Sequence, residues 1–445
     1  PNFKLFFGLN NVPENAFEIT GDSVANLPDD MPLSSLETIV QALLEVMICG
    51  APSVDVSNTW RARWMGLVAS TAFQHNPAIQ PRAFVALGCL ACEEVDDDLL
   101  YQILVALGGA LDNFSENDCS LIQSIIMCLT NIVEKLSRES QYLRSMFWLT
   151  MALIQIGHIP IFQSAVNLLQ VVLRALEAQN FFVENDLVTF LLSSRRPLEK
   201  VTMEMDIEAG INYSHFSFAV AAVLLKGLKN PLTKTSTQAA LLVFLDIAAK
   251  GVNPKNNIIS SSMLGYLAAL LPMSAKDADM KGLLGLVGIS DIDVDDTELQ
   301  TYFKIFEKLE IPDNRTALLL ISLMVTMLHH AESEAESLFL YGFLSEAAKI
   351  VPESFALIYD TLLPKMSHIV STSDTISILD AIHSILYTVV SEPLYKRAND
   401  NQYSYLSEIG FNHLMDCGSF QNVTSEKKAI NARLSSKLVQ CIINY

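Results

Sequence analysis

The chain has 445 residues, of which 51% are hydrophobic and 18% are charged, and its net charge is −20 at pH 7. The high apolar fraction excludes a disordered chain. The excess of 49 acidic over 29 basic residues disfavours nucleic acid and anionic lipid as partners, since both attract Lys and Arg. The length suits two or three domains or one long helical array.

Helical periodicity runs through almost the whole chain, and strand signals are almost absent. In the first helix, residues 34–50, Ser34 or Ser35 is expected to cap the start and Gly50 to end the run. The next predicted helices are 60–73, 80–93, 97–111, 120–136, 141–155, 161–178 and 186–193. The second half continues with 197–208, 216–228, 235–249, 262–271, 297–309, 314–330, 334–350, 352–363, 373–390, 403–414 and 425–445.

Short polar turns join these helices, with about 35–45 residues per helix pair, which is the spacing of HEAT and armadillo arrays. We therefore expect an all-α fold, a HEAT/armadillo-like α-solenoid. Sequence self-similarity between repeats is weak, so another all-helical architecture remains open. The predicted organisation is a lead-in with a first helix (1–58), helical repeats (59–250), and further repeats with C-terminal helices (251–445). Exposed loops are expected at 51–58, 251–257, 277–296 and 391–401.

Two uncharged windows, 145–173 and 256–275, are long enough to span a membrane. The first carries Gln155, Gly157 and Pro160 near its middle, which predicts a turn between two helices. The second contains three consecutive serines, and neither window has a basic cluster on one flank. Buried helices are therefore favoured over membrane spans. The first residues lack a signal peptide, and the start at Pro1 predicts a piece of a longer protein.

Three groups of residues have the residue types that metal or redox chemistry uses. Cys89 and Cys92 have Cys-x-x-Cys spacing, but they lie in an apolar helix without a second ligand pair, so a buried helical pair is favoured. The acidic run 291–298 starts like a calcium loop but lacks its glycine and its final glutamate, and it is expected to cap the next helix. His329 and His330 lack zincin spacing and fit the end of a helix.

The main basic spot is the pair Arg195 and Arg196, in "SSRRPLEK". One interpretation of this pair is that it binds a phosphate or an acidic partner. Neutralisation of the preceding helix C-terminus is favoured, with Pro197 as the first residue of the next helix. No catalytic, cofactor-binding or metal-ligating residue is predicted anywhere in the chain, and all seven cysteines suit a reducing compartment.

The most distinctive run spans residues 59–91. Trp60 and Trp64 are four residues apart and share a helix face. Pro77 predicts a turn, and Pro81 suits the first turn of the next helix. The run is either a structural helical hairpin with an aromatic contact or a hairpin that lines a partner surface, and the pattern alone leaves both open.

This run carries a family resemblance. "AFQHNPAIQPRAFVALGCLA" (72–91) closely resembles the corresponding stretch of neurofibromin and its fungal relatives, the inhibitory regulators of the Ras–cyclic AMP pathway. "PLEKVTMEMDIEAGINYSHFSFAVAAVLLKGLKNP" (197–231) resembles a second stretch of that family. "FWLTMALIQ" from residue 147 and "YLAALL" from residue 266 fall in the same order along the chain as in the family, and "EIGFNHL" near residue 411 is a weaker match.

The resemblance implies that this stretch of the protein has a non-catalytic role. In this family a GTPase-activating domain supplies an arginine finger to Ras, and a Sec14-like and PH-like lipid module follows it. The stretch matched here corresponds to the helical-repeat region after both, so no arginine finger is assigned. We expect a non-catalytic scaffold that needs no cofactor or metal.

The expected partners follow from the same resemblance. They are a second copy of the chain, other domains of the same protein, kelch-repeat regulators, and Ras indirectly through the activating domain. The expected location is the cytoplasm, with recruitment to membranes through the other domains and no direct insertion. The alternatives are a helical adaptor unrelated to Ras and a metal-binding or enzymatic helical domain.

Overall fold

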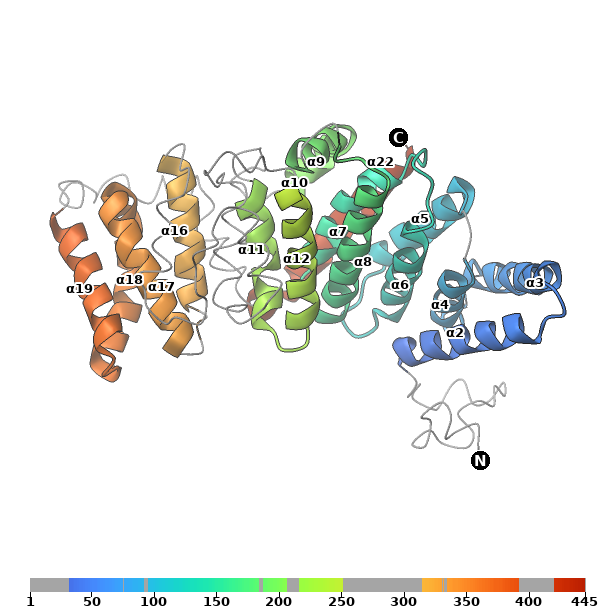
Figure 1. Cartoon of the computed structure of the whole chain (residues 1–445), viewed down its shortest axis with the longest axis horizontal. Coiled ribbons are helices and arrows are strands. Elements are labelled where there is room, and N and C mark those ends of the chain that lie inside the picture. Colours follow the sequence, from blue (N-terminus) through green and yellow to red (C-terminus); the bar gives the residue numbers. More distant parts are fainter. Residues whose placement is uncertain are drawn as a thin grey trace, which may run out of the picture. The chain divides into compact units, whose positions relative to one another are not determined.

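The computed structural model describes residues 32–74, 76–91, 95–183, 187–205, 216–250, 314–329, 331, 334–391 and 420–444. These ranges are almost entirely helical and contain no β-strand (Figure 1). Val95 and Leu136 form an isolated bridge, which is not part of a sheet. The prediction of an all-α chain is therefore confirmed for the described part, whereas the HEAT/armadillo-like solenoid remains a prediction.

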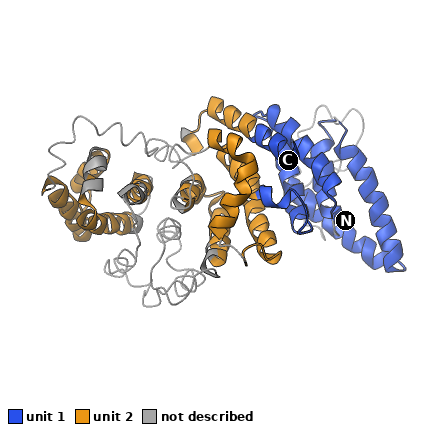
Figure 2. Ribbon diagram, turned by 90° about the horizontal axis from the view of Figure 1, so that it is seen from above, with its two compact units in different colours: residues 1–146, 435–445 blue, residues 147–434 orange. Residues whose placement is uncertain are grey.

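The chain divides into two compact units (Figure 2). Unit 1 comprises residues 1–146 and 435–445, and unit 2 comprises residues 147–434. The helices of unit 1 are α2 (Leu33–Gly50), α3 (Val54–Ala72), α4 (Gln80–Leu90), α5 (Asp97–Asp112), α6 (Ser120–Val133), the 3-10 turn η1 (Leu143–Ser145) and the second half of α22 (Ser425–Asn444).

The core of unit 1 forms around α4, which packs against α2, α3 and α6. Gly88 of α4 lies directly against the backbone of Cys128 in α6, because a Cβ built on this glycine would be 2.8 Å from the Cys128 Cα. On another side of α4, Cys89 and Leu90 pack with Val40 of α2 and Trp64 of α3. Helix α5 packs against α6, and α22 contacts α5 at Gly108.

Unit 2 contains the remaining helices. They are α7 (Met146–Gln155), α8 (Ile159–Ala178), α9 (Leu187–Arg195), η2 (Arg196–Leu198), α10 (Glu199–Met205), α11 (Phe216–Lys229), α12 (Lys234–Lys250), α16 (Asn314–His329), α17 (Glu334–Ile350), α18 (Pro352–Thr372), α19 (Ile376–Ser391), η3 (Phe420–Asn422) and the first half of α22.

Aromatic side chains form much of the core of unit 2. Phe147, Phe216 and Phe244 stack in series with ring centroids 6.1 Å apart, and Trp148 packs edge-on against Phe147 at 5.2 Å. Helix α12 packs against α8 and α11, whereas α17 packs against α16, α18 and α19. Large buried rings of this kind contribute much of the apolar area removed from water.

Several predicted boundaries were wrong. Helix α3 begins at Val54 rather than at residue 60, because the Ser53 side chain accepts a hydrogen bond from the Val56 amide and caps the helix. The expected loop at 51–58 is therefore mostly helix. Helix α18 continues through Pro364 to Thr372 instead of ending at residue 363, because Leu362 and Met366 on either side of the proline are both buried.

The predicted turn within 145–173 is confirmed, since α7 ends at Gln155, α8 begins at Ile159, and Gly157 adopts a positive φ of 75°. Two described helices, α2 and α8, have the length and apolarity that a membrane span requires. In α8, 61% of the apolar 18-residue stretch that meets this requirement is buried inside the protein, as in a core helix. In α2 the buried share of the corresponding stretch is 11%. The second window, 256–275, lies outside the described residues.

Candidate functional site

The hairpin formed by α3 and α4 is held together at its turn. The buried Gln80 side chain donates a hydrogen bond from Nε2 to the Ala72 carbonyl at 2.9 Å, which satisfies a free carbonyl at the end of α3. Phe73 packs edge-on against Phe84 with ring centroids 5.7 Å apart. Pro81 lies in the first turn of α4, as predicted. These contacts hold the ends of α3 and α4 together at the turn.

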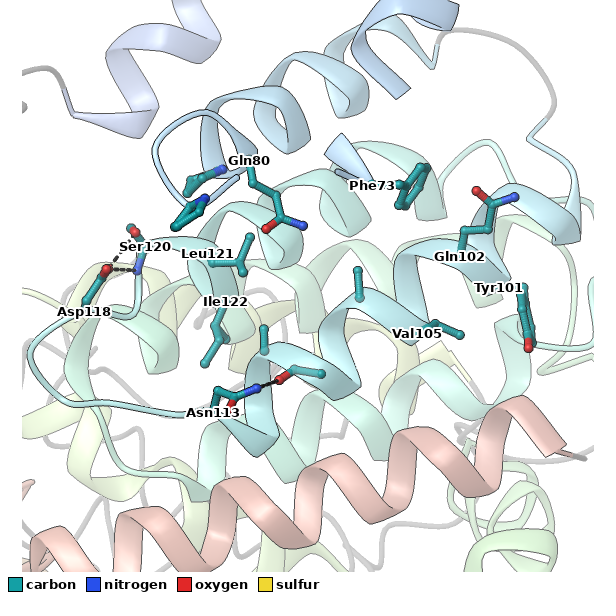
Figure 3. Close-up of a pocket in the computed structure, with 15 residues that line it drawn as sticks. Phe73, Gln80, Tyr101, Gln102, Val105, Asn113, Asp118, Ser120, Leu121 and Ile122 are labelled. Atoms are coloured by element: carbon teal, nitrogen blue, oxygen red, sulfur yellow. Dashed lines mark hydrogen bonds between the residues drawn. The ribbon is translucent and has the colours of Figure 1, made fainter. Parts of the chain in front are cut away.

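An open groove lies between the turn of this hairpin, α5 and the start of α6 (Figure 3). We call it the α5 groove. Its volume is about 670 Å³. Its lining residues are Phe73, Pro77, Gln80, Pro81, Tyr101, Gln102, Val105, Ala106, Gly109, Ala110, Asn113, Asp118, Ser120, Leu121 and Ile122.

One face of α5 forms a long side of this groove. Tyr101, Val105, Gly109 and Asn113 recur every four residues, which places them in one row along the helix. Tyr101 is 45% exposed and Val105 is 48% exposed, although both side chains are largely apolar. Lys, Arg and Glu are absent from the lining, so the middle of the groove is an uncharged surface open to water.

The charges at the groove lie at its ends and are acidic. Asp118 accepts hydrogen bonds from the Ser120 amide at 3.1 Å and from the Ser120 hydroxyl at 2.7 Å, which caps the start of α6 (Figure 3). Asp112 is exposed in the last turn of α5, next to the lining residue Asn113. Asp98 is exposed one turn before Tyr101. The groove lining is therefore uncharged along its length, and acidic residues lie toward both of its ends.

The cysteine and histidine groups weighed from the sequence are only partly described. Cys89 is buried in α4, with its Sγ 4.0 Å from the Glu37 carbonyl oxygen, and burial raises the pKa of the neighbouring Cys128 thiol. A ring nitrogen of His329 lies 3.3 Å from the Thr361 carbonyl oxygen. Cys92, His330 and the acidic run 291–298 lie outside the described residues. Across the described ranges, no three His, Cys, Asp or Glu side chains are grouped to hold a metal.

The two arginines of the basic spot, Arg195 and Arg196, have different surroundings in the structure. Arg195, in the last turn of α9, is buried, with its guanidinium 5.1 Å from the centroid of the Trp148 ring. Its Nε donates to the Thr202 hydroxyl at 2.8 Å. Arg196 is exposed at the start of η2. Arg195 therefore joins α9 to Trp148 and α10, a packing role that the sequence interpretation did not foresee.

The α5 groove was not predicted from the sequence. The hairpin at 59–91 was singled out, but the groove is formed by the end of that hairpin together with α5 and α6, and only the fold brings these segments together. The run "YQILVALGGALDN" (101–113) contained a sign of this surface. No charged residue occurs between Asp98 and Asp112, so the positions of α5 that face water there are uncharged.

Comparison with known proteins shows a similarity to a fungal regulator. The inhibitory regulator protein IRA2 of Saccharomyces cerevisiae is 23% identical over 186 residues, which is 40% of this chain and 6% of that protein. The chain thus spans a small part of the length of this curated relative. No family model matches the chain. The relative is one of the fungal inhibitory regulators that the sequence motifs resemble, so a distant relationship to that family is supported.

A search of solved structures found an engineered protein that covers 94% of this chain at 11% identity, and 97% of that protein is covered in turn. The TM-score is 0.29, which is too low to bear on fold or function.

Proposed function

We propose that this chain is a non-catalytic helical scaffold in a neurofibromin-like Ras GTPase-activating protein. It supports negative regulation of Ras–cyclic AMP signalling by holding partners and a second copy of itself, while the activating domain elsewhere in the protein acts on Ras. The observation that carries the proposal is the similarity to a yeast inhibitory regulator protein, in a chain whose motifs resemble the same family.

The packing of the helices supports a scaffold role. Alternate helices contact one another, as in α4 with α6, α16 with α18 and α17 with α19, and sequential helices pair within each unit. Stacked helical pairs of this kind bury a continuous core and leave long surfaces for docking. The α5 groove is one such surface, and we propose it as a partner site of the scaffold.

The proposed partners remain those implied by the family resemblance: a second copy of the chain, other domains of the same protein, and kelch-repeat regulators. Ras would be affected indirectly. We propose a cytoplasmic location, with membrane recruitment by other domains. The acidic chain, with a net charge of −20, supports protein partners over anionic lipid.

The test compares three purified proteins in a GTP hydrolysis assay with Ras: this chain alone, the full-length protein, and the full-length protein without this segment. We expect no acceleration by the chain alone and similar acceleration by the other two. In cells, the protein without the segment should restrain Ras less than the full-length protein at equal abundance. Acceleration by the chain alone, or full restraint without the segment, would refute the proposal.

A further inference from the structure

Three features of the α5 groove are not explained by packing among the described residues. They are a glycine in the middle of a helix, a row of apolar side chains in water, and an acidic residue at the negative end of a helix dipole. We propose that the groove binds an amphipathic helix of a partner protein, with its apolar side on α5 and its Lys or Arg residues at the acidic ends. This rests on the partner-docking role proposed above and specifies the chemistry of the partner.

The first feature is Gly109. A Cβ built on this residue meets no described residue within 4 Å, so packing within the described part of the chain does not require a glycine there. The preceding residue is different, because a Cβ on Gly108 would be 3.5 Å from Val439 and 3.8 Å from Ser436, in ordinary contact with α22. Glycine in a helix interior is less stable than alanine. Its use on the open side of α5 fits a backbone that another helix approaches closely.

The second feature is the row of exposed side chains. Tyr101 and Val105 leave apolar surface in water, and Gly109 and Asn113 continue their row along α5. Tyr101 to Asn113 spans about 18 Å of helix axis, since each residue adds roughly 1.5 Å. A partner helix of three to four turns has this length, and its residues at i, i+3, i+4 and i+7 would cover the row.

The third feature is the position of the charges. Asp112 lies in the last turn of α5, where the helix dipole disfavours negative charge, and that turn holds no basic residue. Asp118 and Asp98 add negative charge at the two ends of the groove, and the lining contains neither Lys nor Arg. A partner with basic residues beside its apolar face would gain from all three carboxylates. A second copy of this acidic chain fits this surface less well.

The probe is a fluorescent synthetic helix of about 15 residues, with leucines on one face and lysines on the other, the length that spans the groove. A matched peptide carries glutamate in place of each lysine. Binding to the 445-residue chain is measured by fluorescence anisotropy at low and high salt. We expect saturable binding of the lysine peptide, weaker binding at high salt, and at least about tenfold weaker binding of the glutamate peptide.

Matched variants locate the binding site. Gly109→Trp fills the groove, whereas Gly66→Trp places the same ring on the exposed side of α3, at another glycine with nothing within 4 Å of its Cβ. Asp112→Lys reverses a charge at the groove, and Glu45→Lys makes the same change in net charge on α2. Thermal unfolding checks that each variant is folded. We expect at least about tenfold weaker binding for the two groove variants and wild-type binding for both controls.

Three outcomes would overturn the inference: no saturable binding of the lysine peptide, equal binding of the two peptides, or wild-type affinity of the folded Gly109→Trp variant. Ras is absent from this assay. A negative result in the peptide assay would therefore not decide whether the chain belongs to a Ras regulator, which the GTP hydrolysis assay tests. A negative result in the hydrolysis assay would likewise not change a measured affinity of the groove for the peptide.

Discussion

Gly88 and Gly109 are both glycines in helices of unit 1, but their surroundings differ. A Cβ on Gly88 would be 2.8 Å from the Cys128 Cα and 3.3 Å from its carbonyl oxygen, so α4 and α6 approach as closely as they do only because that position has no side chain. The backbone of α6 cannot yield as a flexible side chain could.

We therefore expect Gly88→Ala to lower the free energy of unfolding by about 1–3 kcal/mol through overpacking. Gly109→Ala is the matched control, since its Cβ enters open space, and it should raise stability by about 0.5–1 kcal/mol through helix propensity. Urea unfolding followed by circular dichroism measures both. Equal effects of the two substitutions would contradict the close approach at Gly88.

Arg195 and Arg196 provide a second comparison between neighbouring residues. Arg195→Lys should cost about 1–2 kcal/mol, because lysine cannot lie flat on Trp148 while donating through Nε to Thr202. Arg196→Lys should leave the urea midpoint unchanged, because Arg196 is exposed. If the Arg195 variant were as stable as the Arg196 variant, the contact with Trp148 would not contribute to stability.

Among the helices, α16 and α18 are joined where His329 meets the Thr361 carbonyl. Burial lowers the pKa of His329 below its ordinary value of 6.5; the contact with the Thr361 carbonyl raises the pKa, and Lys365 lowers it further. The neutral ring is thus favoured in the folded state. The unfolded chain binds this proton first on acidification, so the contribution of His329 to stability is present above pH 6.5 and falls below it.

The urea midpoint of the wild type should therefore fall more between pH 7.5 and pH 5.5 than that of His329→Gln. The glutamine variant keeps a side-chain donor for Thr361 but does not titrate. The comparison also removes the contribution of the many carboxylates, which both proteins share. An identical fall in the two proteins would show that His329 is not coupled to folding in this way.

Most helices, and the turn between α7 and α8, could be predicted from the sequence because local signals determine them: apolar periodicity, Gly157, and Pro81 in the first turn of α4. The start of α3 and the passage of α18 through Pro364 were missed, since a serine cap and burial on both sides of the proline outweigh the local signals. The α5 groove was missed because its walls come from the turn between α3 and α4 together with α4, α5 and α6.

For the whole molecule, the proposed self-association has to overcome a net charge of −20 on each copy. Two such chains repel at low ionic strength, and salt screens the repulsion over about 10 Å at 0.1 M. We therefore expect the molar mass from light scattering to rise toward that of a dimer with increasing protein concentration. At a fixed concentration it should rise further with added salt. A mass of one chain under all of these conditions would exclude self-association through this region.

The contact of α22 with α5 has a consequence for synthesis on the ribosome. Ser436 donates a hydrogen bond to the Gly108 carbonyl at 3.1 Å across 328 residues of sequence, and Val439 packs at the same place. Helical repeats can fold one after another as they emerge from the exit tunnel. Unit 1 is completed late, because one side of α5 stays uncovered until residues 436–439 have been translated. During that interval the nascent chain exposes a surface that chaperones can bind.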